Sequence, residues 1–140
     1  MAEFERDNFC FACGKDNPIG LGMNVQLFPE GAKSRVSIAP EYQGWTDVVH
    51  GGIVTTLLDE IMAHAVHSHV GDAVTTTLTV TFRQALKVNQ PVDVIGRVTE
   101  RKKRSVSAEA EIRAADNGKV IAKAQSQFIL LSGRFSKNSS

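Results

Sequence analysis

The sequence predicts an α+β fold in which one long central helix is wrapped by a curled antiparallel sheet of five to six strands. Three observations predict it: one segment with helical apolar spacing, several segments with two-residue alternation, and the order strand, strand, helix, then about four strands. A single apolar helix must be covered, and one antiparallel sheet is the only material available. Because a one-layer sheet leaves other surfaces uncovered, we expect a homo-oligomer, either a dimer or a dimer of dimers.

The composition is that of an ordinary globular chain. The 140 residues are 42% hydrophobic and 22% charged, with a formal net charge of +1. This balance excludes a disordered chain and predicts no nucleic-acid or membrane partner. No apolar run approaches the roughly 18 residues of a membrane span, and the N-terminus lacks a signal-peptide pattern. Two cysteines are too few for a disulfide framework, so we expect a cytoplasmic location.

The chain divides into three parts: an ordered leader at 1–21, one domain at 22–132 and a frayed tail at 133–140. The leader is rich in Gly, Asn, Asp and Cys and has little periodicity, which indicates a loop laid over the domain. We expect three bulky apolar side chains to anchor it, namely Phe9, Phe11 and Ile19.

Strands are predicted on both sides of the helix. Residues 22–28 and 33–39 alternate apolar with polar side chains, and Pro29-Glu30-Gly31 supplies a hairpin turn between them. After the helix, β-branched or alternating runs predict four more strands, at about 74–82, 90–100, 105–114 and 119–131. The last two are separated by Asn117-Gly118, a strong hairpin signal.

The helix is predicted at about residues 52–68. Its apolar positions form a wide stripe at helical spacing: Ile53, Val54, Leu57, Leu58, Ile61, Met62, Ala65 and Val66. The opposite face is small or polar: Thr55, Thr56, Asp59, Glu60, Ala63 and His67. The sequence therefore predicts one buried side and one side that a second helix could approach.

Two glycines stand at the start of this helix, in His50-Gly51-Gly52. Their backbone N–H groups have no side chains in the way, and the positive end of the helix dipole strengthens their attraction for a negative oxygen. This is the arrangement of an oxyanion hole for a carbonyl under attack. The alternative is that the glycines only make a tight turn.

Asp59 lies on the polar face, seven residues beyond Gly52. At about 1.5 Å of rise per residue, the two positions are roughly 10 Å apart along the axis. Asp59 therefore cannot act on a carbonyl held by the glycines of its own helix. If both belong to one site, they must come from two chains. A solvated acid is the alternative, and Glu60 could be argued in the same way.

Residues 50–60, which read HGGIVTTLLDE, resemble the motif of the hotdog-fold acyl-CoA thioesterases, in particular the PaaI-like branch of phenylacetic acid degradation. The strand order and the upstream Tyr42-Gln43-Gly44-Trp45 are similar as well, and the likeness covers about residues 22–131. The leader segment Cys10-Phe11-Ala12-Cys13-Gly14 also resembles one found in a subset of that family.

The resemblance implies hydrolysis of acyl-CoA by a site built between subunits, with no metal or redox cofactor. Asp59 matches the family's catalytic carboxylate, either as nucleophile or as general base for water. Gly51 or Gly52 would polarise the thioester carbonyl. The other implied catalytic residues are His50, which orients this loop, Thr75, which positions the water, and Gln43, which faces the carbonyl. One departure is Phe82-Arg83-Gln84-Ala85, where the family commonly has a proline.

Coenzyme A carries phosphates, so a basic rim is expected. The candidates are Arg83, Lys87, Arg101, Lys102 and Arg104; for the basic turn at 101–104, an ordinary solvated turn is the alternative. Thr76 and Trp45 are further substrate-binding candidates, and Tyr42 and Trp45 could instead be loop packing. The acyl group itself stays open, since it depends on how Trp45, Met62 and Phe82 pack.

The pair Cys10-x-x-Cys13 has metal-ligand spacing, but a four-coordinate zinc needs two more ligands. His64, His67 and His69 lie toward the end of the predicted helix, with no reason in the sequence to meet the cysteines. We therefore expect no metal, and two small apolar residues in a loop.

Two other functions remain open at the level of sequence. One is a non-catalytic acyl-CoA sensor with the same fold, although no DNA-binding segment fits outside the domain. The other is a hotdog hydratase or dehydratase, which needs a differently placed histidine and acid. Thiol release from acyl-CoA separates all three.

Overall fold

The computed structural model describes residues 5 and 7–131 and has the predicted order of elements. The strands are β1 (Gln26–Phe28), β2 (Gly31–Val36), β3 (Ala73–Phe82), β4 (Val92–Arg101), β5 (Ser105–Ala114) and β6 (Val120–Leu130). The helices are a short 3₁₀ turn η1 (Pro40–Tyr42) and the long α1 (Gly51–His69). The tail expected at 133–140 lies outside the described residues.

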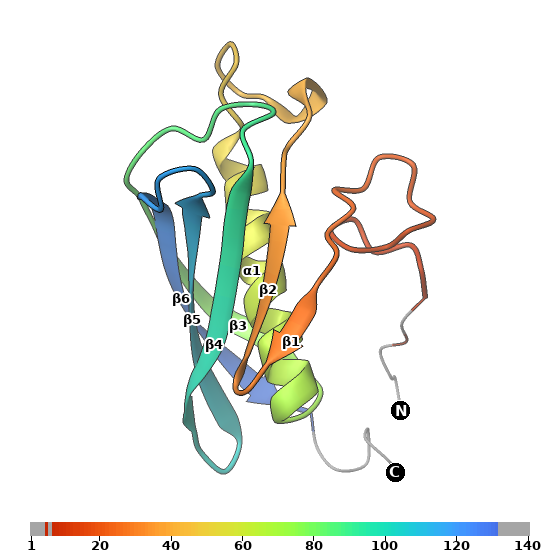
Figure 1. Cartoon of the computed structure of the whole chain (residues 1–140). Helices are drawn as coiled ribbons and strands as arrows, with labels where there is room; N and C mark the ends of the chain where they lie inside the picture. Colours follow the sequence, from red (N-terminus) through yellow and green to blue (C-terminus); the bar gives the residue numbers. More distant parts are fainter. Residues whose placement is uncertain (1–4, 6, 132–140) are drawn as a thin grey trace.

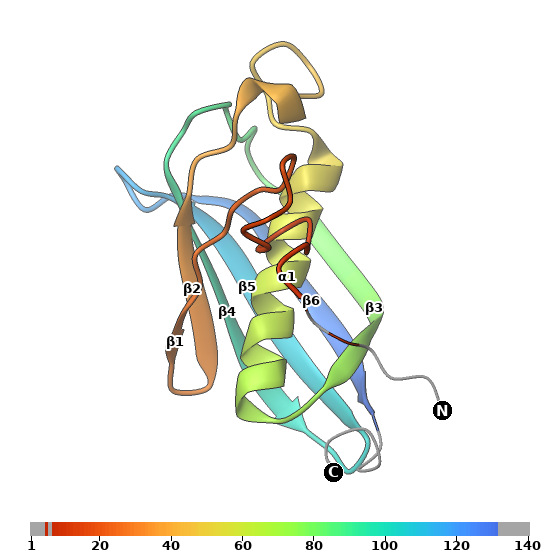
Figure 2. The same ribbon diagram turned by 90° about the vertical axis from the view of Figure 1, so that its right-hand side faces the viewer.

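The six strands form one antiparallel sheet that curls around α1 without closing (Figures 1 and 2). The strand order is β1-β2-β4-β5-β6-β3, so β3 is an edge strand that pairs with β6 alone. This confirms the predicted fold of one helix wrapped by a single sheet. The open edge at β3 runs alongside the helix in Figure 2.

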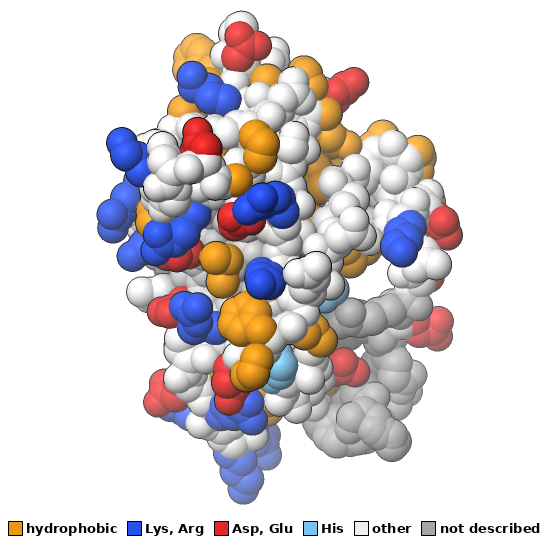
Figure 3. Space-filling view, in the orientation of Figure 1, with side chains coloured by type: hydrophobic (Ala, Val, Ile, Leu, Met, Phe, Trp, Pro, Cys, Tyr) orange, Lys and Arg blue, Asp and Glu red, His pale blue; other side chains and the backbone are white. Residues whose placement is uncertain are grey.

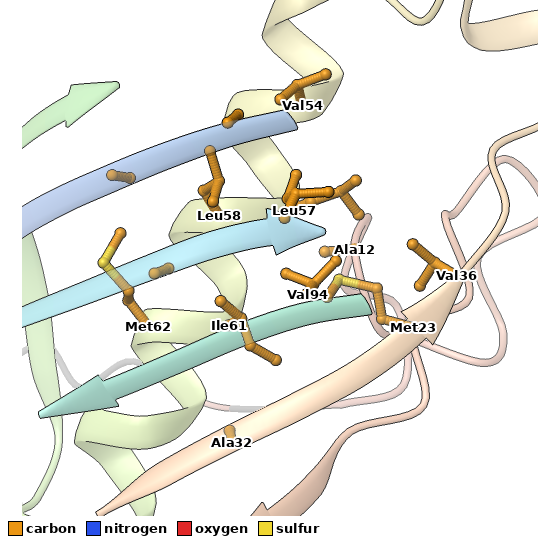
Figure 4. Packing of buried hydrophobic residues seen from close by; sticks show 14 of the residues in the cluster. Ala12, Met23, Ala32, Val36, Val54, Leu57, Leu58, Ile61, Met62 and Val94 are labelled. Atoms are coloured by element: carbon orange, nitrogen blue, oxygen red, sulfur yellow. The ribbon is translucent and has the colours of Figure 1, made fainter. Parts of the chain in front are cut away.

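The core lies between α1 and the concave face of the sheet (Figure 4). Of the predicted stripe, seven side chains are buried and Ile53 is half-buried. Gly96 on β4 lets the helix approach closely, because a Cβ there would lie 3.0 Å from Ile61 Cγ2 and 3.2 Å from its backbone oxygen. The spacing between helix and sheet therefore depends on a missing side chain.

The first strand is shorter than predicted. The backbone N–H of Met23 bonds to the carbonyl of Ala12 in the leader, which removes it from strand pairing. The hairpin is tighter than expected, because Glu30 adopts a φ of 63° and Phe28 pairs directly with Gly31. Strand β2 therefore begins two residues earlier than predicted.

The leader is anchored differently from the expectation. Phe9 and Ile19 are 59% and 66% exposed, so two of the three predicted anchors are wrong. Ala12 is the buried hydrophobic residue of the leader, and its carbonyl accepts the N–H of the buried Met23, which follows the leader. Phe11 does make the expected contact, packing edge-on against Tyr42 with ring centroids 6.3 Å apart.

The convex face of the sheet carries acidic and basic side chains side by side (Figure 3). Two pairs cross neighbouring strands, Arg35 with Asp93 at 2.8 Å and Arg97 with Glu109 at 3.5 Å. Such exposed pairs are typical of a solvated face and contribute little stability. Within the described part of the chain, no helix has the length and apolar character to cross a membrane.

Candidate active site

The start of α1 presents one free backbone donor. His50 is the N-cap: its Nδ1 accepts the Gly52 N–H at 2.9 Å, and its carbonyl accepts the next two helical N–H groups. Among the described residues, the Gly51 N–H has no hydrogen-bond partner. Of the two glycine donors expected from the sequence, Gly51 is therefore the one available to a substrate oxygen.

An aromatic ring stands next to this donor. Phe82, at the end of β3, lies with its ring edge 3.7 Å from the position that a Cβ on Gly51 would occupy, and its side chain is 54% exposed. By contrast Met62 is fully buried and accepts a hydrogen bond from Ser126. Of the three residues expected to shape the acyl pocket, Met62 thus belongs to the core and Phe82 borders the Gly51 donor.

The loop before α1 is held by its own hydrogen bonds. Gln43 Oε1 accepts the Asp47 N–H at 3.1 Å, and Gly44 and Val48 bond through their backbones. Trp45 at the tip is 84% exposed. Because the Gln43 oxygen is occupied, its amide NH₂ is the end left to donate hydrogen bonds outside the loop.

Asp59 and Thr75 meet on the side of α1 that faces β3. Thr75 Oγ1 donates to Asp59 Oδ1 at 3.0 Å, and Oδ2 has no partner among the described residues. Burial raises the pKa of the half-buried Asp59 carboxyl, the Thr75 hydrogen bond opposes the rise, and the nearby charge of Glu60 adds to it. A carboxylate with a raised pKa is a better general base.

A β-bulge places Thr75. The pairing of β3 with β6 shifts between Thr75 and Thr77, which leaves Thr76 as the extra residue. The bulge changes the alternation, so that Thr75 and the half-buried Leu78 both face the helix side. The Thr76 hydroxyl instead donates a hydrogen bond to the Gln127 carbonyl of β6, at 3.2 Å.

The predicted catalytic residues form two groups within one chain. Asp59 and Thr75 lie at the middle of α1 and the beginning of β3, whereas His50, Gly51 and Gln43 lie at the other end of that strand. The axial separation of about 10 Å therefore stands, and the structure does not bring the two groups together in one protomer.

The basic candidates are divided in the same way. Lys87 and Arg83 lie in the connection after β3, where Lys87 bridges to Val48 beside the helix start. Arg101, Lys102 and Arg104 lie at the β4–β5 turn, at the opposite end of the molecule (Figure 1). Arg101 is paired there with Glu30 at 2.7 Å.

Glu60 faces the leader instead of β3. Its Oε2 lies 3.1 Å from His64 Nε2 and 3.8 Å from Cys10 Sγ. Burial opposes ionisation, but hydrogen bonds from His64, Cys13 and Cys10 together hold the pKa of Glu60 below its usual value. Sequence reasoning did not foresee this cluster, because the leader's path over α1 is set by backbone hydrogen bonds with no periodic signal.

Comparison with known proteins gives a family match and a shared fold. Residues 46–121, more than half of the chain, match the model of the thioesterase superfamily. None of the curated proteins compared matches this sequence. The family match agrees with the resemblance seen in the sequence.

Three solved structures illustrate the shared fold. A thioesterase superfamily protein has a TM-score of 0.82 at 22% identity, over 87% of this chain; the present chain spans only 60% of that protein's length. A conserved protein from Pseudomonas aeruginosa has a TM-score of 0.72 at 30% identity, over 79% of this chain and 90% of its own. The PaaI protein from the phenylacetic acid degradation operon of E. coli has a TM-score of 0.72 at 21% identity, over 78% and 83%.

Proposed function

We propose that this chain, which belongs to the thioesterase superfamily and resembles its PaaI-like hotdog-fold members, hydrolyses acyl-CoA thioesters at a site shared by two protomers. One observation carries the proposal. A half-buried carboxylate with a raised pKa and a single hydroxyl partner lies at one end of an unpaired edge strand, and the free Gly51 N–H lies at the other end.

The edge strand supplies the geometry for a shared site. Pairing β3 with β3 of a second copy, antiparallel about a two-fold axis, would set the beginning of one strand beside the end of the other. Thr75, with Asp59, would then lie near Phe82 and Gly51 of the second protomer. Asp59 and Thr75 of one protomer would thus form one site with Gly51 and Gln43 of the other.

The same two-fold pairing would join the basic residues. The β4–β5 turn of one protomer, with Arg101, Lys102 and Arg104, would approach the end of the second protomer that carries Arg83 and Lys87. These side chains are exposed in the single chain and would bind the phosphates of coenzyme A, Arg101 after leaving its pairing with Glu30. No metal or redox cofactor enters this proposal.

In the proposed reaction Asp59 acts as general base. Oδ2 accepts a proton from a water molecule as the water oxygen attacks the thioester carbonyl carbon. The Thr75 hydroxyl gives its one hydrogen to Asp59, so it can hold the water only as an acceptor. Gly51 N–H and the Gln43 amide stabilise the oxyanion. The C–S bond then breaks, and the proton passes from Asp59 to the thiolate, giving the free acid and CoA.

The first test is a thiol-release assay with arylacetyl-, short-chain and long-chain acyl-CoAs. We expect turnover of at least one class by the purified chain. Binding of acyl-CoA without thiol release would favour a sensor, and addition of water to an enoyl-CoA would favour a hydratase. Either result would contradict the proposed hydrolysis.

A matched pair of substitutions at Gly51 tests the backbone donor. Proline suits the first position of a helix, and His50 already has the extended backbone that precedes proline, with φ −57° and ψ 136°. Gly51→Pro removes the N–H and should lower kcat by about 100-fold or more. Gly51→Ala keeps the N–H, and its Cβ would make an ordinary 3.7 Å contact with Phe82, so it should retain most activity.

Mixing two inactive variants tests whether the site is shared. A heterodimer of Asp59→Asn and Gly51→Pro contains one site with both substitutions and one site with neither. After subunit exchange, half of the dimers are heterodimers, so about a quarter of wild-type activity should return. A mixture that stays inactive, although exchange is confirmed by mass spectrometry, would place both groups in one chain's site.

A further inference from the structure

A second cluster of reactive side chains lies on the flank of α1 away from β3. Cys10 and Cys13 from the leader and Glu60 from the helix place one sulfur, one sulfur and one carboxylate oxygen within 4.8 Å of one another. All three side chains are half-buried. His64, one turn beyond Glu60, contacts the same carboxylate through Nε2 at 3.1 Å.

A tight backbone turn in the leader holds Cys10 and Cys13 close together. The Gly14 N–H bonds to the Cys10 carbonyl at 2.8 Å and closes a turn over 10–14. A Cβ on Gly14 would lie 2.3 Å from the Cys10 nitrogen, so only glycine fits this turn. Further backbone bonds join Leu21 to Phe11 and Met23 to Ala12. Backbone hydrogen bonds thus fix the turn that carries the two cysteines, and the leader lies over α1 in Figure 2.

We propose that Cys10, Cys13 and Glu60 bind one zinc ion, with His64 orienting the Glu60 carboxylate by its hydrogen bond. The ligand atoms of a tetrahedral zinc site with bonds of about 2.0–2.3 Å lie roughly 3.5–3.8 Å apart. The separation of 3.8 Å between Cys10 Sγ and Glu60 Oε2 fits this value. The structure thereby supplies the acidic ligand that the spacing of the cysteines alone could not identify.

The ligand set selects the type of metal. Two thiolates favour zinc over magnesium or calcium, which prefer oxygen ligands. Carboxylates that bind metals are themselves held by hydrogen bonds, as His64 holds Glu60 here. The three proposed ligands leave one position of a tetrahedral ion open, and all three line a pocket together with Asp7, Phe9 and Ala63 among others. A water molecule can fill that position, and the pocket gives the metal a way in.

The proposed zinc would join the leader to the helix. The ligands come from two segments 50 residues apart in the chain, so one ion would tie residues 10–14 to the middle of α1. Asp59 points to β3 and does not belong to this cluster. The role is therefore structural, and it is independent of the proposed hydrolysis.

The test uses the full, untagged chain, purified under reducing conditions. Elemental analysis should find about one zinc per chain. After zinc removal, titration with cobalt(II) should give one equivalent of binding with a thiolate-to-cobalt charge-transfer band. No bound zinc and no such band in the reduced protein would overturn the proposal.

Single substitutions assign the ligands. Cys13→Ser should weaken the charge-transfer band and lower cobalt affinity by about 100-fold or more. Glu60→Gln should lower affinity at least tenfold while keeping the band, and His64→Ala should lower it by about 10- to 100-fold. Asp59→Asn, next in the chain but facing β3, should leave affinity unchanged. Unchanged affinity in both Cys13→Ser and Glu60→Gln, with circular dichroism like that of wild type, would overturn the assignment.

Discussion

Asp59 and Glu60 are neighbouring carboxylates on one helix, yet the structure gives them opposite environments. Asp59 faces β3, has one hydroxyl partner and has its pKa raised by burial. Glu60 faces the leader, where a histidine and two cysteines hold its pKa below the usual value despite burial. The difference teaches that a rotation of about 100° around the helix axis is enough to give one carboxylate a raised pKa and its neighbour a lowered one.

The largest expected effect separates the two carboxylates by activity. Asp59→Asn keeps the shape of the side chain but removes the base, so kcat should fall by about 100-fold or more. Glu60→Gln should change kcat by no more than about threefold, because its carboxylate faces away from the proposed site. Thiol release at saturating acyl-CoA measures both. Equal losses of kcat in the two variants would contradict the prediction that only Asp59 takes part in the reaction.

A smaller effect is expected from the partner of Asp59. Thr75→Val keeps the size of the side chain but removes the hydroxyl, and kcat should fall about tenfold, as expected for one hydrogen bond to a charged group. Thr75→Ser keeps the hydroxyl and should retain activity within about threefold. If valine and serine behave alike, the hydroxyl has no part in the reaction.

The smallest expected effect concerns stability. In reduced, metal-free protein at neutral pH, Glu60→Gln should lower the free energy of unfolding by about 1–2 kcal/mol, since it weakens hydrogen bonds to a charged group. Asp59→Asn should leave it unchanged or raise it by up to about 1 kcal/mol, because an ionised, half-buried group is removed. Urea unfolding compares the two. A larger loss of unfolding free energy in Asp59→Asn than in Glu60→Gln would contradict this prediction, because it would mean that the Asp59 carboxylate contributes more stability than that of Glu60.

Periodicity was enough to predict the fold. The apolar stripe on the helix has the same members in the structure, and four of the strands begin and end within two residues of their predicted bounds. The first two strands were less accurate, because Met23 is drawn to the leader by a backbone bond that no side-chain pattern encodes.

The candidate site was predictable only in part. The family resemblance implied functional roles for Asp59 and Thr75, and the structure places the two side chains in direct contact. It could not choose between Gly51 and Gly52, since that choice depends on the rotamer of His50. Nor could it connect Cys10 with Glu60, because the path of an aperiodic loop is fixed by tertiary hydrogen bonds. The roles of these residues stay predictions.

The close contact of α1 with the sheet at Gly96 affects the start of the helix and its midpoint together. A Cβ on Gly96 would lie 3.0 Å from Ile61 Cγ2, so we expect Gly96→Ala to push α1 away from the sheet and to shift Gly51 and Asp59 together. In the proposed dimer these two points serve different reaction centres. One added methyl group would thus impair both sites of the proposed dimer together, because the same helix contributes residues to each of them.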